Sequence, residues 1–182
     1  MSLFETERLI VRKFSPEDWK DLYEYLSDEK AVEYEPYEVF TEEDCRKEAI
    51  YRSESENFLA VCLKENGKLI GNLYFQQQEP EEFKTWEIGY VFNPRFYGRG
   101  YATESCRGLL EILFRQYKAH RVMARCNPEN TASWELLERL SMRREGYFKK
   151  PAFFKVDSEG KPVWHDAYEY SILEEEYVAA EK

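Results

Sequence analysis

A strand-like run that passes through a glycine-containing loop into a helix constrains this chain more than any other feature. Residues 86–92 are aromatic or β-branched, apart from Glu87 and Gly89, which is typical of a buried strand. An Asn-Pro pair ends this run. Across residues 102–117 apolar side chains recur at spacings of three and four, which predicts an amphipathic helix. The chain is therefore expected to fold around a strand, a loop and a helix in series.

The loop between this strand and this helix carries two glycines one residue apart, Gly98 and Gly100. Glycine adopts a positive φ easily, so the main-chain N–H groups of the loop can converge on one point at the helix N-terminus, where the helix dipole also favours negative charge. Arg95 and Arg99 add positive charge. The loop lacks the Lys-Ser/Thr of a P-loop, and Thr103 stands where a dinucleotide fingerprint has Gly or Ala. It predicts an anion cradle of another kind, with a tight turn as the alternative.

Several segments, in order along the chain, resemble the GCN5-related N-acetyltransferase (GNAT) superfamily. Residues 95–102, in the pattern Arg-x-x-Gly-x-Gly-x-Ala, match its signature loop, and residues 87–90 match the strand before it. Residues 6–12 (Thr-Glu-Arg-Leu-Ile-Val-Arg) are similar to the opening strand of the RimJ/RimL-like ribosomal-protein N-acetyltransferases, and residues 127–133 are similar to that branch's second cofactor segment. The matches run from residue 6 to about residue 174, nearly the whole chain.

The resemblance implies acetyl-CoA as the acetyl donor, no metal, and a primary amine that attacks the thioester directly. It places the diphosphate on the N–H groups of residues 96–101 and the pantetheine arm against the main chain of residues 91–93, where two parallel strands separate at a bulge. The N–H of Val91 would then face the thioester oxygen. The predicted cofactor-binding residues are Val91, Phe92, Asn93, Arg95, Phe96, Tyr97, Gly98, Arg99, Gly100, Tyr101, Ala102 and Asn130.

Two side chains are candidates for catalysis. Glu87 is a carboxylate inside an otherwise apolar strand, where partial burial would raise its pKa toward the range of a general base; a salt bridge across the sheet is the alternative. Ser133 matches the serine of the RimL-like pattern and would hydrogen-bond the departing sulfur, because no tyrosine lies between Tyr117 and Tyr147; an ordinary early-helix serine is the alternative. Asn130 is also a plausible helix cap.

The other elements follow from local signals, and the resemblance implies how they are arranged. The expected elements are a strand over 7–14, a helix from Ser15 to about Ser27, a helix from Thr41 to about Ser53, a hairpin of 58–64 with 68–77, a strand over 120–126, a helix from Asn130 to about Leu140, and a hairpin of 143–154 with 163–173. Ser141 stands where relatives usually have a glycine. The expected fold is the α/β (α+β) GNAT fold, a mixed, mostly antiparallel sheet of six to seven strands with a splayed parallel pair in the middle and about four helices.

Composition limits the remaining possibilities. The 182 residues, 43% of them hydrophobic, favour one domain over 1–182, and the absence of a membrane-span or signal-peptide pattern favours a cytoplasmic protein with no membrane partner. The four cysteines lack metal-ligand spacing and are expected to be buried thiols. A net charge of −10 argues against nucleic acid as a partner and favours a cationic acceptor.

The sequence therefore predicts an acetyl-CoA-dependent N-acetyltransferase. The acceptor is a protein N-terminal amine, a polyamine or an aminoglycoside-like amine, with the acidic and aromatic segment 31–40 as a candidate wall of its site. A catalytically silent CoA-binding sensor of the same fold, and a nucleotide-phosphate enzyme, are the alternatives. Aromatic residues of the last hairpin, including Tyr147 and Trp164, can supply a homodimer face or pack in the core.

Overall fold

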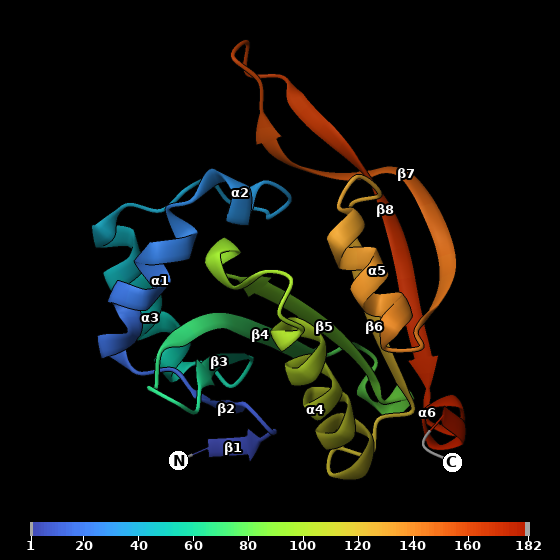
Figure 1. Cartoon of the computed structure of the whole chain (residues 1–182). Helices are drawn as coiled ribbons and strands as arrows, with labels where there is room; N and C mark the ends of the chain where they lie inside the picture. The colour runs from blue at the N-terminus through green and yellow to red at the C-terminus, as the bar shows by residue number, and fades with distance from the viewer. Residues whose placement is uncertain (1, 181–182) are drawn as a thin grey trace. The chain divides into compact units, whose positions relative to one another are not determined.

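The protein is a mixed α/β structure built on an eight-stranded sheet (Figure 1). The computed structural model describes residues 2–180. The strands follow the order β1-β2-β3-β4-β5-β6-β8-β7, in which β5 and β6 are parallel, whereas β1–β2, β2–β3, β3–β4, β6–β8 and β7–β8 are antiparallel. The strands are β1 (Ser2–Glu5), β2 (Leu9–Lys13), β3 (Phe58–Leu63), β4 (Leu69–Gln77), β5 (Thr85–Phe92), β6 (Arg121–Cys126), β7 (Arg143–Val156) and β8 (Pro162–Leu173).

Within residues 2–180, the chain forms four longer helices and several short ones besides the strands. The α-helices are α1 (Trp19–Leu26), α2 (Glu29–Val32), α3 (Glu42–Glu54), α4 (Tyr101–Arg115), α5 (Thr131–Arg139) and α6 (Glu174–Ala180). Short 3-10 turns are η1 (Pro16–Asp18), η2 (Glu81–Phe83) and η3 (Pro94–Phe96). None of the helices within residues 2–180 is long and apolar enough to cross a membrane.

The residues group into two compact units. The first unit contains the chain up to Glu33, Glu38–Phe75 and Gly89–Leu109; the second contains Tyr34–Tyr37, Gln76–Ile88 and the chain from Leu110 onward. Strand β5 and helix α4 each contribute residues to both units. The prediction of one domain over 1–182 stays a prediction.

In the first unit, local sequence signals place α1, α3 and the hairpin of β3 and β4 as expected. Ser15 and Thr41 each form a capping box, which starts η1 and α3. Helices α1 and α3 lie side by side (Figure 1). The hairpin turns at Gly67, which has a φ of +73°. Strand β4 contains a bulge, because Val61 pairs with Gly71 and Cys62 pairs with Leu69, which leaves Ile70 as the extra residue.

In the second unit, β6 lies between β5 and β8. Its parallel pairing with β5 joins Thr85–Glu87 to Arg121–Met123, and both strands continue past these pairs, β5 to Phe92 and β6 to Cys126. On its other edge β6 pairs with β8 along its whole length. Strands β7 and β8 form the predicted last hairpin, whose far end extends beyond α5 in Figure 1.

The structure has more elements than the sequence predicted. The sheet has eight strands instead of six to seven, because β1 precedes the expected first strand. Strand β1 has four mostly exposed residues and therefore no alternation of buried and exposed side chains to signal it. Helix α2 has four residues, too few for a periodic pattern, and α6 follows β8 without a break. The four cysteines are free and buried, as predicted.

Helix α5 ends in a Schellman motif built on a serine. The N–H of Met142 donates to the carbonyl of Leu137 (3.0 Å), the N–H of Ser141 donates to that of Glu138 (2.9 Å), and Ser141 has a φ of +62°. Glycine is the usual residue at this position, because a Cβ is strained in the left-handed region. Ser141 therefore carries a conformational strain that glycine would not.

We expect Ser141→Gly to raise the free energy of unfolding by about 0.5–1 kcal/mol, because relief of the left-handed strain outweighs the extra entropy of glycine in the unfolded chain. Urea unfolding followed by circular dichroism measures this change. Ser158→Gly is the matched control, since Ser158 lies in the β7–β8 turn with no positive φ, and it should give no gain. Equal effects of the two substitutions would contradict the assignment of strain to Ser141.

Candidate functional site

The predicted anion cradle has the backbone conformation that it requires. Gly98 has a φ of +73° and Gly100 a φ of +79°, and α4 begins at the next residue. A Cβ added at Gly98 would meet no atom within 4 Å, so the space above this glycine is open. Both glycines are exposed. These observations confirm the positive φ angles that the loop sequence predicted.

The donors of the loop begin two residues later than the sequence suggested. The N–H groups of Phe96 and Tyr97 donate to the carbonyls of Asn93 (2.9 Å) and Pro94 (3.2 Å), which closes η3. Within residues 2–180, the N–H groups of residues 98–103 have neither a main-chain nor a side-chain acceptor. Helix geometry alone leaves the first N–H groups of α4 without partners, and the glycine turn adds those before it. The loop therefore presents a continuous row of exposed donors at a helix N-terminus.

Asn93 fixes the entry to this loop. Its side chain is 1% exposed. Its N–H donates to the carbonyl of Ile70 on β4 (2.8 Å), its Oδ1 accepts the N–H of Arg95 (3.0 Å), and its Nδ2 donates to Glu24 (3.3 Å). The N–H of Asn93, which sequence reasoning offered to the cofactor, is thus already engaged within the fold.

The alternation of β5 decides which edge each N–H group faces. The N–H of Asn93 points toward β4, and an alanine methyl at Gly71 of β4 would lie 2.7 Å from the carbonyl oxygen of Val91. Residues two apart in a strand direct their main-chain groups to the same edge, so the N–H of Val91 also faces β4. By the same alternation, we expect the N–H of Phe92 to face the opposite edge of β5.

A second contact with the loop comes from Arg8, a residue that the sequence did not predict to belong to the site. Arg8 lies just before β2, and its guanidinium donates to the carbonyl of Arg99 (3.0 Å) and to Glu104 in the first turn of α4 (2.7 Å from Nε). It also lies 4.5 Å from the centre of the Tyr101 ring. No spacing rule connects two residues 96 positions apart, so only the folded chain reveals this contact.

The two loop arginines behave differently. The side chain of Arg95 is 76% exposed, and its guanidinium lies 3.9 Å from the Glu24 carboxylate, so Glu24 neutralises its charge only weakly. The guanidinium of Arg99 lies 5.5 Å from the Phe96 ring, over a neighbour in the loop. Both side chains therefore remain near the cradle, where they add positive charge.

Glu87 lies in the second unit, half-buried on β5 opposite Met123 of β6. Burial raises the pKa of Glu87 above its ordinary value of 4.5, against the opposing effect of the Arg125 charge. Within residues 2–180 its carboxylate makes no hydrogen bond or ion pair, and Arg125 instead pairs with Glu169 (3.0 Å). The structure therefore supports a raised pKa and does not contain the cross-sheet salt bridge that the sequence left open.

Asn130 and Ser133 lie at the start of α5, also in the second unit. Asn130 caps this helix, because its Oδ1 accepts the N–H of Ser133 at 3.2 Å. Burial raises the pKa of the Cys126 thiol to about 11, and a hydrogen bond with the Ser133 side chain partly opposes that shift. The Ser133 hydroxyl is thus held against the end of β6.

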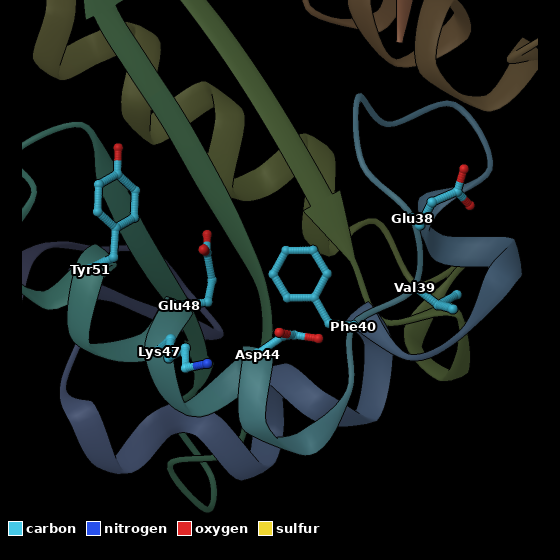
Figure 2. A pocket seen from close by; sticks show the side chains of 7 residues that line it. All are labelled: Glu38, Val39, Phe40, Asp44, Lys47, Glu48 and Tyr51. Atoms are coloured by element: carbon cyan, nitrogen blue, oxygen red, sulfur yellow. The ribbon is translucent and has the colours of Figure 1, made fainter. Parts of the chain in front are cut away.

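Figure 2 shows a separate open pocket of about 410 Å³ in the first unit. Segment 38–40 forms one side and α3 the other; the lining residues are Glu38, Val39, Phe40, Asp44, Lys47, Glu48 and Tyr51. Most of its charges have partners: Asp44 bonds Thr41 in the capping box, Lys47 pairs with Glu43 (2.7 Å), and Glu48 pairs with Arg52 (2.6 Å). The pocket combines carboxylates with aromatic rings, the chemistry expected for segment 31–40.

The predicted site residues fall into two groups. The first unit contains Val91, Phe92, Asn93, Arg95, Phe96, Tyr97, Gly98, Arg99, Gly100, Tyr101 and Ala102, and the second contains Glu87, Asn130 and Ser133. The first group forms one continuous structure, the end of β5 and the loop into α4. The second lies on β5 and at the start of α5. Sequence reasoning missed Arg8, Glu104 and Glu24, which hold the first group in place.

Comparison with known proteins gives consistent matches over most of the chain. The protein-family model of the acetyltransferase (GNAT) domain matches residues 8–143. An uncharacterized N-acetyltransferase of Bacillus subtilis, YnaD, is 40% identical over 94% of this chain and 97% of its own. A ribosomal protein uS5 alanine N-acetyltransferase of Escherichia coli is 25% identical over 79% of each chain. A crystal structure of a GNAT-family acetyltransferase from Bacillus anthracis, 40% identical, superposes with a TM-score of 0.85 over 94% of this chain and 98% of that one.

The raised pKa of Glu87 predicts a pH-dependent effect of Glu87→Gln on stability. Ionisation of Glu87 is less favourable in the folded than in the unfolded protein. The free energy of unfolding therefore falls as the pH rises from the pKa of Glu87 in the unfolded chain through its raised pKa in the folded protein. Glutamine has no such loss. We therefore expect Glu87→Gln to stabilise the protein more, relative to wild type, at pH 8 than at pH 4, as measured by urea unfolding. Glu82→Gln, at an exposed position of η2, is the control, and a Glu87→Gln effect independent of pH would contradict the burial argument.

Proposed function

The chain belongs to the GNAT family of N-acetyltransferases, and from this membership we propose that it transfers an acetyl group from acetyl-CoA to a cationic primary amine. The products are an N-acetylated amine and the free CoA thiol. The observation that carries the proposal is the row of N–H donors over residues 98–103, which begins with the two positive-φ glycines and continues into the first turn of α4. Such a row binds a phosphate group without a metal ion or a lysine.

The cradle suits the diphosphate of acetyl-CoA. Acetyl-CoA supplies the acetyl group as a thioester. The open space above Gly98 admits a phosphate oxygen close to the backbone, and the free N–H groups offer it hydrogen bonds. The exposed Arg95 and Arg99 add positive charge beside it. Tyr101 and Ala102 contribute their main-chain N–H groups.

We assign the main-chain contact with the pantetheine arm to Phe92 in place of Val91. The N–H of Asn93 donates to Ile70 of β4, and regular alternation puts the N–H of Val91 on the same edge and that of Phe92 on the opposite edge of β5. A donor on that edge can pair with an extended arm or stabilise negative charge on the thioester oxygen. Asn93 then supports the site by fixing the loop.

We propose that Glu87 accepts the proton of the acceptor ammonium, directly or through one water. An ammonium group has no lone pair, so the amine must lose a proton before it attacks. The half-buried carboxylate of Glu87, free of ion pairs within residues 2–180 and with a raised pKa, has the properties of such a base.

Ser133 remains the proposed donor of a hydrogen bond to the leaving sulfur. Its contact with Cys126 holds its hydroxyl at the start of α5, and the hydroxyl must turn its single O–H from Cys126 to the sulfur to act as this donor. Asn130 positions Ser133 by accepting its N–H, and this cap is the role that we propose for Asn130 alongside contact with the cofactor. Water is the alternative source of the proton.

The acceptor is proposed at the level of a class. The Escherichia coli relative is named for a ribosomal-protein alanine, and an L-2,4-diaminobutyric acid acetyltransferase of Halomonas elongata is 23% identical over 86% of this chain. Protein N-termini and small amines are therefore both consistent with the family. The carboxylates and rings of the Figure 2 pocket suit a cationic group of either kind.

A cytoplasmic location and a homodimer stay predictions. Several rings of the last hairpin are exposed, as a dimer face would require: Tyr147, Phe148, Phe153, Phe154 and Trp164.

Release of free thiol from acetyl-CoA, measured against N-terminal peptides, polyamines and aminoglycosides, tests the proposed activity. We expect acceptor-dependent release, and we expect Glu87→Gln to lower kcat by about 100-fold or more because the base is lost. The rise of the wild-type rate with pH should also disappear in this variant, whereas the control Glu82→Gln should behave as wild type. Binding of acetyl-CoA without release for any acceptor would favour a catalytically silent sensor, and full turnover by Glu87→Gln would exclude Glu87 as the base.

A pair of glycine substitutions tests the cradle. Gly98 and Gly160 have nearly the same φ (+73° and +78°), and a Cβ at either would meet no atom within 4 Å. Gly98→Glu and Gly160→Glu therefore impose a similar backbone strain, but only the former places a carboxylate beside the proposed phosphate site. We expect calorimetry to show loss of CoA binding, at least 100-fold, for Gly98→Glu alone. Equal affinity of the two variants would rule out the phosphate assignment.

A further inference from the structure

Arg8 and Glu104 make an unusually dense set of contacts for residues at the protein surface. The Glu104 carboxylate accepts hydrogen bonds from the Thr6 hydroxyl (2.5 Å), the Arg8 N–H (2.8 Å) and the Arg8 Nε (2.7 Å), and it lies 2.6 Å from Arg8 Nη2. The side chain of Glu104 is 17% exposed. A single exposed ion pair contributes little, but several donors converging on one shielded carboxylate fix its position.

The same guanidinium reaches the anion-binding loop itself. Arg8 Nη1 donates to the carbonyl of Arg99, the residue between the two cradle glycines, at 3.0 Å. A Cβ at Gly100 would lie 3.5 Å from Arg8 Nη2, which places the guanidinium beside the loop backbone. The N–H of Glu104 donates to the carbonyl of Gly100 (3.0 Å), so Arg8 and Glu104 together hold both carbonyls that flank the turn.

These contacts address two physical problems of a free row of N–H groups. Glycine residues allow many backbone conformations, and ordering them upon ligand binding costs free energy. The Glu104 carboxylate also carries a negative charge in the first turn of α4, where it would repel an anion. The hydrogen bond from Arg8 to the carbonyl of Arg99 restricts the conformations of the loop. The positive charge of Arg8 also compensates the negative charge of Glu104.

We infer that Arg8 is a positioning residue for the acetyl donor, which acts with Glu104 as a clamp that holds the loop 98–103 in its anion-binding conformation before the ligand arrives. The inference rests on the proposed function. The clamp pre-organises main-chain donors, so its loss weakens binding of CoA and leaves the chemical step unchanged once the donor is saturating. Thr6 is also part of the clamp, because its hydroxyl donates a hydrogen bond to Glu104.

Arg12 provides a matched control in the same unit. Arg12 lies on β2, and its guanidinium donates to both carboxylate oxygens of Asp18 (2.8 and 2.7 Å) and to the carbonyl of Lys13 (2.9 Å). Arg12→Gln therefore removes a comparable ion pair and carbonyl contact from the fold without touching the loop. If both Arg8→Gln and Arg12→Gln lower the free energy of unfolding, that loss is a general effect on the fold. If only Arg8→Gln weakens the binding of CoA, the effect belongs to the loop.

The test measures the dissociation constant of CoA by calorimetry, KM for acetyl-CoA and kcat, and hydrogen exchange of the Glu104 amide in the ligand-free protein. We expect Arg8→Gln to raise the dissociation constant and KM about tenfold, the size of one charge-assisted hydrogen bond, and to leave kcat within about twofold. Exchange of the Glu104 amide should become faster in Arg8→Gln and stay unchanged in Arg12→Gln, because its hydrogen bond to the Gly100 carbonyl is the first one after the loop. Arg8→Lys should recover part of the affinity, because lysine keeps the charge but not the fork of donors.

A double variant separates the two parts of the clamp. Arg8→Gln/Glu104→Gln removes the uncompensated carboxylate, so its affinity for CoA should exceed that of Arg8→Gln alone if Arg8 acts partly by compensating Glu104. Wild-type affinity and exchange in Arg8→Gln would overturn the inference while the proposed function stands. A wild-type protein that fails to bind CoA would overturn the proposed function, and the role of the clamp in binding with it.

Discussion

The row of unpaired N–H groups at the start of α4 is the constraint on which the rest of the structure depends. An α-helix leaves its first donors without partners, and the turn at Gly98 and Gly100 adds more before the first helical residue. Such groups cost free energy when they are buried, so this end of the helix must stay open to water or to a ligand. The surrounding fold holds the loop at both ends and leaves its donors free.

The supports of the loop come from segments far apart in the sequence. Asn93 holds the entry through β4 and Glu24, and Arg8 with Glu104 holds the exit. Glu24 on α1 is itself held by Lys68, which lies 2.5 Å away, so α1 and the β3–β4 turn also brace the loop. In the second unit, Glu87 lies where β5 pairs with β6, and Ser133 lies at the capped start of α5. Each unit thus holds its own proposed site residues through contacts within that unit.

Sequence patterns predicted the elements whose signals are local. The N-cap at Ser15, the capping box at Thr41, the Asn-Gly hairpin and the apolar periodicity of α4 each depend on neighbours within a few residues, and the structure confirms them. The raised pKa of Glu87 was also predictable, because a carboxylate in an apolar strand is partly desolvated wherever that strand packs. Strand β1, by contrast, has no buried stripe, and its place in the sheet is set by pairing with β2. The contacts of Arg8, and the edge of β5 that Phe92 faces, depend on chain segments that meet only after folding, so no local pattern encodes them.

The main-chain character of the cradle has a consequence for how the protein tolerates mutation. Donors that belong to the peptide bond survive the replacement of almost any side chain, so an alanine scan of residues 95–103 would underestimate the importance of this loop. Sensitivity should concentrate instead at the two glycines and at the distant residues that hold the backbone. Relatives can therefore diverge widely in the side chains of the loop while they keep one donor-binding geometry. Under the proposed function, a lineage is free to exchange acceptors without rebuilding the loop that would recognise the donor.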